Sequence, residues 1–223
     1  MLFRSVFSQN CIQYLYTDFG AYGIRVVSIP FYATSSESQI QYMINDAEVK
    51  YLFVGEQDQY DKAHRIFPLC PSLERIIIFD ESVRVSSHDP NAIYFEDFLR
   101  LGEGLPRQTE VEKRWAEANE DDVCNILYTS GTTGASKGVI LNYRQYNAAI
   151  IANGKCVGVS DKDRAINFLP FTHVFERGWS YLCLSVGAQL IINTYPKEIQ
   201  DSMRETHPTC MSSVPRFWEK VYQ

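Results

Sequence analysis

The sequence has no pair of cysteines at the C-x-x-C spacing that is typical of zinc ribbons and redox motifs. Its six cysteines stand far apart, so we expect reduced thiols in the core of a cytoplasmic protein. Clusters of basic residues are also missing. The net charge of −6 is negative, so the sequence predicts no positively charged surface that would attract a polynucleotide. We therefore expect no nucleic-acid partner.

Long apolar runs are absent as well. The segment YLCLSVGAQLII is interrupted by Ser, Gly and Gln and is too short to span a bilayer, and the first ten residues contain no signal-peptide core. A chain of 223 residues with 45% apolar composition can bury a sizeable core. We expect a globular protein without a transmembrane segment, in the cytoplasm or peripheral at a membrane surface.

What the sequence does contain is an alternation of helical and strand patterns. Apolar positions at helical spacing over residues 12–19 precede the short β-branched run RVVSIPF, and the same order returns twice within the first 80 residues. Ser36 and Gln39 form a capping box at the start of the second helix. Strands separated by such helices predict an α/β fold with a mainly parallel sheet.

This pattern divides the chain into three parts. Residues 1–80 form a first α/β subdomain, residues 81–122 a polar connection with helices, and residues 123–223 a second α/β subdomain that is incomplete at its carboxyl end. In the last part, the strands VCNILYTS and KGVILN flank a glycine-rich loop. Asn142 then predicts the N-cap of the helix YRQYNAAIIANGKCV.

The glycine-rich loop lies in the segment YTSGTTGASKGV, residues 128–139. Glycine-rich turns let several backbone N–H groups approach an anion. The segment is not a Walker A loop, which needs Gly-Lys followed by Ser or Thr, and it is not a G-x-G-x-x-G dinucleotide fingerprint. We interpret it as a phosphate loop of a third kind. The alternative is a flexible hairpin with a surface lysine.

This segment resembles the glycine-rich phosphate loop of the AMP-forming adenylating enzymes, which include acyl-CoA synthetases, luciferases and peptide-synthetase adenylation domains. Three further stretches are similar to long-chain fatty acid–CoA ligases: residues 8–57, FLPFTHVFERG at 168–178 and VPRFWEKVY at 214–222. One departure is Ser136, which stands where most relatives have proline before the lysine. The resemblance implies an amino-terminal domain of two packed α/β subdomains.

The resemblance also implies a reaction. ATP and a long-chain fatty acid form acyl-AMP and pyrophosphate, and coenzyme A then takes the acyl group. Mg²⁺ is an implied cofactor, although the magnesium-binding glutamate of the family is not in this sequence and we predict no metal site. The pyrophosphate of ATP would be held by side-chain hydroxyl groups, by backbone that approaches it closely at the glycines, and by the cation of one lysine. The residues so implied are Thr129, Ser130, Gly131, Thr132, Thr133, Gly134 and Lys137.

The motif FLPFTHVFERG supplies the acyl-pocket residues. By resemblance, His173 lies beside the acyl group and the adenylate and is the catalytic candidate. Without the motif, a histidine between apolar residues is more often a core side chain. Glu176 and Arg177 belong to the same acyl-pocket region by resemblance. Their alternative is a solvent-exposed charge pair on a helix face.

The relatives are longer than this sequence. Their adenine-stacking motif, their ribose-binding aspartate and their carboxy-terminal domain with a catalytic lysine do not occur in it. We therefore expect a fragment of a long-chain fatty acid–CoA ligase that is inactive alone and self-associates through its unfinished subdomain. The alternative is a truncated, non-catalytic phosphate- or nucleotide-binding module.

Overall fold

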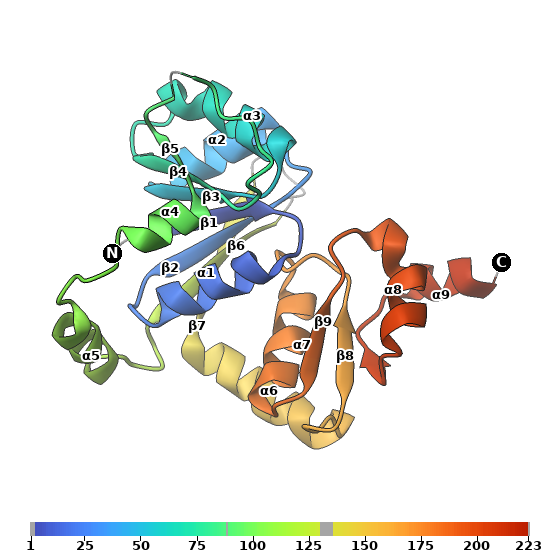
Figure 1. Cartoon of the computed structure of the whole chain (residues 1–223). Helices are drawn as coiled ribbons and strands as arrows, with labels where there is room; N and C mark the ends of the chain where they lie inside the picture. Colours follow the sequence, from blue (N-terminus) through green and yellow to red (C-terminus); the bar gives the residue numbers. More distant parts are fainter. Residues whose placement is uncertain (1–2, 88, 130–135, 223) are drawn as a thin grey trace. The chain divides into compact units, whose positions relative to one another are not determined.

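The computed structural model describes residues 3–87, 89–129 and 136–222. The chain divides into two compact units, Met1–Arg144 and Gln145–Gln223, and each is described by itself (Figure 1). The first unit contains a seven-stranded sheet in the order β5-β4-β3-β1-β2-β6-β7, and the second contains a three-stranded sheet in the order β10-β8-β9.

Strands and helices alternate along the first unit. Its strands are β1 (Phe3–Ser8), β2 (Val27–Tyr32), β3 (Tyr51–Val54), β4 (Arg75–Ile78), β5 (Ala92–Tyr94), β6 (Val123–Thr129) and β7 (Lys137–Asn142). Its helices are α1 (Ile12–Tyr22), α2 (Glu37–Asp46), α3 (Gln57–Ile66), the 3₁₀ turn η1 (Phe67–Leu69), α4 (Phe95–Arg100) and α5 (Gln108–Ala116).

The second unit repeats the alternation around its smaller sheet. Its strands are β8 (Arg164–Asn167), β9 (Gln189–Ile192) and β10 (Cys210–Met211). Its helices are α6 (Tyr143–Val157), α7 (Val174–Ser185), η2 (Pro196–Glu198), α8 (Ile199–Thr206) and α9 (Pro215–Tyr222). Within the ranges that the structure describes, no helix is long and apolar enough to cross a membrane. All six cysteines are free thiols.

The predicted α/β fold with mainly parallel sheets is confirmed. Every described pairing between neighbouring strands is parallel except that of β6 with β7, which is antiparallel. The predicted capping box is present at the start of α2, where the Gln39 N–H donates to Ser36 Oγ at 3.3 Å and the Ser36 N–H donates to Gln39 Oε1 at 2.9 Å.

The division into units differs from the predicted subdomain boundary at residue 123. β6 pairs in parallel with β2, with Ser28 opposite Asn125, so the β6–β7 hairpin belongs to the seven-stranded sheet. β5, in the predicted polar connection, extends the same sheet at its other edge. A strand's apolar pattern shows that it is buried but not which sheet it joins, so the sequence alone could not assign β6 and β7 to a sheet.

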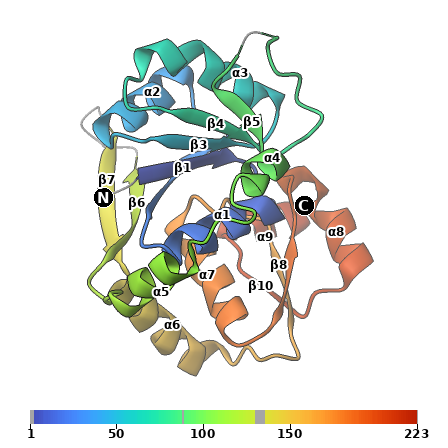
Figure 2. The same ribbon diagram turned by 60° about the vertical axis from the view of Figure 1, so that its left-hand side comes forward.

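The seven-stranded sheet is covered on both faces. α2 and α3 lie on one face, and α1 and α4 lie on the other (Figure 2). Successive side chains of a strand point to opposite faces, so Ile76 and Ile78 join the core under α2 and α3. Phe53 packs on the opposite face, with ring centroids 6.4 Å from Phe95 and 5.5 Å from Phe98 of α4.

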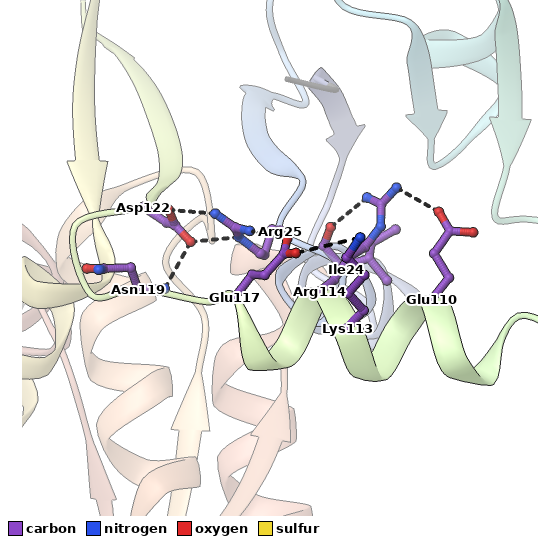
Figure 3. Close-up of polar contacts among 8 residues, drawn as sticks. All are labelled: Ile24, Arg25, Glu110, Lys113, Arg114, Glu117, Asn119 and Asp122. Atoms are coloured by element: carbon purple, nitrogen blue, oxygen red, sulfur yellow. Dashed lines mark hydrogen bonds and ion pairs between the residues drawn. The ribbon is translucent and has the colours of Figure 1, made fainter.

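Helix α5 has no buried residue, and polar contacts attach it to the rest of the unit (Figure 3). Arg114 Nη1 donates to the Ile24 carbonyl at 3.1 Å. The segment after α5 is attached by Arg25, whose Nε and Nη2 donate to the two carboxylate oxygens of Asp122 at 2.8 and 3.1 Å. The same hydrogen bonds hold the pKa of Asp122 below its usual value.

Candidate functional site

The β6–β7 hairpin carries the predicted phosphate loop. Thr129 ends β6, Lys137 begins β7, and the two residues are opposite each other in the antiparallel register. Thr129 Oγ1 donates to the Lys137 carbonyl at 3.5 Å. The structure therefore brings the two ends of the loop together. The loop residues between them that we predicted to bind pyrophosphate lie outside the described residues, namely Ser130, Gly131, Thr132, Thr133 and Gly134.

Lys137 is an exposed cation. Among the described residues, the lysines that form ion pairs are Lys50, Lys62 and Lys113, so Lys137 has no internal counter-ion. An ammonium group that is not already paired can give a charge-assisted hydrogen bond to an incoming phosphate. The position of Lys137 agrees with phosphate binding, and equally with the surface lysine of an ordinary hairpin.

Helix α2 supports the loop on its carboxyl side. The Tyr42 hydroxyl donates to the Ser136 carbonyl at 3.3 Å, and the Tyr128 hydroxyl donates to the Asp46 carboxylate. The two tyrosine rings pack edge to face, with centroids 6.4 Å apart. Burial and the Asp46 carboxylate raise the pKa of Tyr128, so its phenol stays a hydrogen-bond donor. Sequence reasoning missed these contacts because 94 residues separate Tyr42 from Ser136.

Gly138 allows β7 to lie close against β6. A Cβ atom at this position would be 2.7 Å from Ile126 Cγ2, which is closer than two carbon atoms can approach. The glycine after Lys137 is therefore required by the hairpin itself, independently of any ligand.

His173 lies at the start of α7 in the second unit. It is the N-cap residue, and its Nδ1 accepts a hydrogen bond from the Phe175 N–H at 3.2 Å. The side chain is exposed, so the alternative of a core histidine is wrong. A neutral imidazole that accepts at Nδ1 carries its proton on Nε2. His173 can therefore donate a hydrogen bond from Nε2 to a ligand.

Glu176 is fully buried in the first turn of α7. One carboxylate oxygen accepts from Asn167 Nδ2, at the end of β8, and the other accepts from Ser212 Oγ, just after β10. Burial raises the pKa of Glu176 from 4.5 to about 7, and these hydrogen bonds oppose the shift only in part. The alternative of an exposed helix-face charge is wrong.

Arg177 is also buried, at 1% exposure, against other groups of the second unit. Its Nε donates to the Phe171 carbonyl at 2.9 Å, and its Nη1 donates to the Tyr181 hydroxyl at 2.8 Å. Its Cζ atom lies 5.8 Å from the centroid of the Tyr181 ring. The buried side chains of Glu176 and Arg177 thus fix the start of α7, which carries His173.

The three acyl-pocket candidates lie where open α/β sheets bind ligands, at the carboxyl ends of parallel strands. Polar residues follow each strand of the smaller sheet here: Asn167, Asn193 and Ser212. The Asn193 N–H donates to the Asn167 carbonyl at 2.9 Å, which joins the ends of β9 and β8. The sequence did not identify these residues, although each directly follows or ends a strand.

The structure thus brings His173, Glu176 and Arg177 together in the second unit. Thr129 and Lys137 come together in the first unit. In the part of the chain that the structure describes, no three His, Cys, Asp or Glu side chains gather as metal ligands. We assign no residue to the implied Mg²⁺, which proteins usually hold with one or two carboxylates together with phosphate oxygens of the substrate.

The chain is similar in sequence to acyl-CoA ligases. It is 26% identical over 226 residues to fatty acyl-CoA synthetase A of Dictyostelium discoideum, covering 97% of this chain and 32% of that protein. It is 25% identical over 223 residues to the long-chain-fatty-acid–CoA ligase ACSBG2 of Xenopus laevis, covering 96% and 30%. The chain therefore spans about a third of the length of these relatives.

Solved structures share the fold. The anthranilate CoA ligase AuaEII, in complex with anthranoyl-AMP, superposes with a TM-score of 0.80 at 20% identity, covering 94% of this chain and 39% of that one. ATP-bound MatB of Rhodopseudomonas palustris superposes with a TM-score of 0.74 at 20% identity, covering 100% and 41%. The predicted fold class is thereby confirmed.

The family is shown by a match along almost the entire sequence. The family model described as "AMP-binding enzyme" matches residues 5–223, a range that includes the β6–β7 hairpin and the start of α7. The chain belongs to the AMP-binding enzyme family.

Proposed function

We propose that this chain is part of an AMP-forming long-chain fatty acid–CoA ligase. The whole enzyme would activate a fatty acid with ATP to acyl-AMP and pyrophosphate and then transfer the acyl group to coenzyme A. The observation that carries the proposal is the β6–β7 hairpin, which presents an exposed, unpaired Lys137 opposite Thr129 in a chain of the AMP-binding family. The names of its relatives support the substrate class.

In this proposal, residues 129–137 hold the β- and γ-phosphates. ATP supplies the adenylyl group and the pyrophosphate that leaves. Lys137 contributes the cation, and the hydroxyl groups of Thr129, Ser130, Thr132 and Thr133 donate hydrogen bonds to phosphate oxygens. Gly131 and Gly134 leave room for the backbone to approach the phosphates. Tyr42 and Tyr128 are positioning residues, because their contacts orient the hairpin and not the ligand.

His173 is the residue that we propose beside the acyl-adenylate. Its exposed ring can donate from Nε2 to an oxygen of the acyl group while Nδ1 stays bound to the helix end. Glu176 and Arg177 lie in the acyl-pocket region but are buried in hydrogen bonds of their own. We propose that they position His173 and do not contact the substrate.

A second candidate function is a non-catalytic phosphate- or nucleotide-binding module. The observation that favours it is that the exposed, unpaired Lys137 opposite Thr129 suits phosphate binding by itself. Under both candidates the loop binds phosphate, and under both we propose that the chain alone is inactive. An acyl-adenylate analogue separates them, because a module that retains only the phosphate loop would bind this analogue no better than ATP.

The test is a ³¹P NMR titration of ATP with the purified chain. We expect the β- and γ-phosphate signals to broaden and Lys137→Ala to weaken binding about tenfold, since a charge-assisted hydrogen bond is worth about 1.5–3 kcal/mol. Lys155→Ala, at an exposed site in α6, is the matched control and should bind like the wild type. Equal binding by the Lys137→Ala and Lys155→Ala variants would remove the assignment of the loop.

A further inference from the structure

The three-stranded sheet of the second unit reverses its strand order at β8. β8 lies between β9 and β10, and both pairings are parallel. The chain continues from β8 into α7, whose Cys183 packs with Ala165 on one face of the sheet. It continues from β10 into α9, whose Phe217 packs with Ile166 on the other face. In open α/β sheets, ligands bind at such a reversal, in the crevice outside the carboxyl ends of the strands.

The side chain of Glu176 bridges the two strands at this position. One carboxylate oxygen accepts from Asn167 Nδ2 at the end of β8, and the other accepts from Ser212 Oγ just after β10. The carboxylate also accepts a hydrogen bond from the backbone N–H of Phe168. One carboxylate thus joins the ends of both strands to the helix that His173 caps.

All three partners of the carboxylate donate, and an ionised carboxylate is the form that only accepts. Its hydrogen bonds are charge-assisted and stronger than those of the neutral acid. On protonation, one oxygen becomes a hydroxyl group that must donate, so the hydrogen bond with Ser212 has to reverse its direction. The bridge is therefore strongest when Glu176 is ionised. Burial opposes this form and raises the pKa of Glu176 to about 7, so both forms are populated near neutral pH.

The loop between Phe168 and His173 is anchored at both ends by this bridge, because Phe168 donates to the carboxylate and Glu176 follows His173 in the first turn of α7. We propose that Glu176 is a positioning residue that links ligand binding to its own ionisation, because its ionised carboxylate holds this loop in the arrangement that accepts an acyl-adenylate. Glu176 is fully buried and does not touch the ligand. The inference rests on the proposed role of His173.

Other groups near Glu176 have to be distinguished from it. The titratable and charged side chains on β8, β9, β10 and α7, with its N-cap, are Arg164, His173, Arg177, Tyr181, Cys183 and Cys210. Burial raises the pKa of Cys183 to about 12 and also raises that of Cys210, so both thiols stay protonated near neutral pH. Arginine and tyrosine side chains do not titrate there, but histidine does. The experiment therefore has to separate Glu176 from His173.

The test measures the Kd of 5′-O-(N-decanoylsulfamoyl)adenosine from amide shifts of the ¹⁵N-labelled chain. This probe is a non-hydrolysable analogue of decanoyl-AMP, and its acyl sulfamate stays ionised at all pH values used. We expect the Kd to fall about fivefold between pH 5.5 and pH 8.5, as for one strengthened hydrogen bond, with the midpoint near pH 7. Because linkage is reciprocal, binding at pH 7 should release about 0.3 proton, which calorimetry in buffers of different ionisation enthalpy measures.

Three variants assign this pH-dependent change. Glu176→Gln should lose it, and Glu205→Gln, at an exposed position of α8, should behave like the wild type. His173→Asn has no imidazole and should bind the probe more weakly but keep the change in Kd with pH. A change that persists undiminished in Glu176→Gln, or that disappears in His173→Asn, would overturn the proposal.

Ser212→Ala tests the bridge without altering the group that titrates. It removes one donor to the ionised carboxylate, so the midpoint should move to higher pH. Ser213→Ala is the matched control, because the buried hydroxyl of Ser213 has no hydrogen-bond partner among the described residues, and its midpoint should stay where the wild type has it. Equal midpoints in the two serine variants would contradict the bridge.

Wild-type binding of the probe without any pH dependence would overturn this inference and leave the proposed function intact. The absence of binding at every pH would contradict both.

Discussion

Glu176 is a carboxyl group that the fold holds without any charged partner in the contacts described above. Its hydrogen-bond donors, Asn167 and Ser212, are neutral, and burial raises its pKa from 4.5 to about 7. The folded state therefore binds the proton more tightly than the unfolded state does. As the pH rises from about 4.5 to about 7, the free energy of unfolding should fall by as much as about 3 kcal/mol, and it should be level above that range.

Glu176→Gln should remove this pH dependence, because an amide has nearly the same size and shape as a carboxyl group and does not ionise. Urea unfolding at pH 5 and pH 8, followed by NMR signals of the second unit, measures the effect. Glu205→Gln, at an exposed position of α8, is the control and should keep the wild-type pH dependence. A Glu176→Gln variant with the same pH dependence as the wild type would refute a buried, titrating Glu176.

His173 combines a structural contact with the proposed ligand contact. Asn is a good N-cap residue, so His173→Asn should retain the thermal midpoint, whereas His173→Ala should lose about 0.5–2 kcal/mol of stability with the cap. Neither variant has an imidazole. We expect both to bind a non-hydrolysable acyl-adenylate analogue about fivefold more weakly, as for one lost hydrogen bond. If both variants bind the analogue like the wild type, His173 does not contact the ligand.

Among the helices, α5 depends on polar contacts for its position (Figure 3). Arg114 connects it to the Ile24 carbonyl and also pairs with Glu110 at 3.1 Å. Arg114→Ala should raise amide hydrogen exchange in α5 several-fold while the unit as a whole loses less than about 1 kcal/mol, because exposed ion pairs contribute little. The neighbouring Lys113→Ala, which removes only a 3.9 Å pair with Glu117, should leave the exchange unchanged. Equal exchange in the two variants would show that Arg114 does not hold α5.

The local elements were more predictable than their assembly. Residues 123–130 and 137–142 were predicted as strands, but only the pairing of β6 with β2 shows which sheet they join. β5 and α8 were not predicted individually, because they are short and lie in polar sequence. The burial of Glu176 could not be foreseen, since Asn167 and Ser212 surround it from elements 9 and 36 residues away in sequence. A local sequence pattern shows the periodicity of an element. It does not show which side chains from distant parts of the sequence will contact that element in the folded protein.

For the whole molecule, we expect self-association through one edge of the seven-stranded sheet. β7 is the edge strand, and Val139 and Ile140 on it are 45% and 61% exposed. Exposed apolar edge strands pair with other chains, and we expect a native mass above that of the monomer by light scattering. Ile140→Lys should restore the monomer, whereas Ile151→Lys, at a similarly exposed position of α6, should not. A monomeric wild type would contradict self-association through this edge.

Phosphate binding by residues 129–137 is the feature on which the proposed function depends. An ATP titration of the ¹⁵N-labelled chain, followed by amide chemical shifts, tests it residue by residue. We expect the largest shifts in this segment, with an affinity no better than about millimolar, because the loop is the one nucleotide-anchoring element that we predict in this sequence. Saturable shifts that map to other residues would contradict a phosphate loop in this chain. The absence of any shift at ATP concentrations well above the millimolar range would contradict it as well.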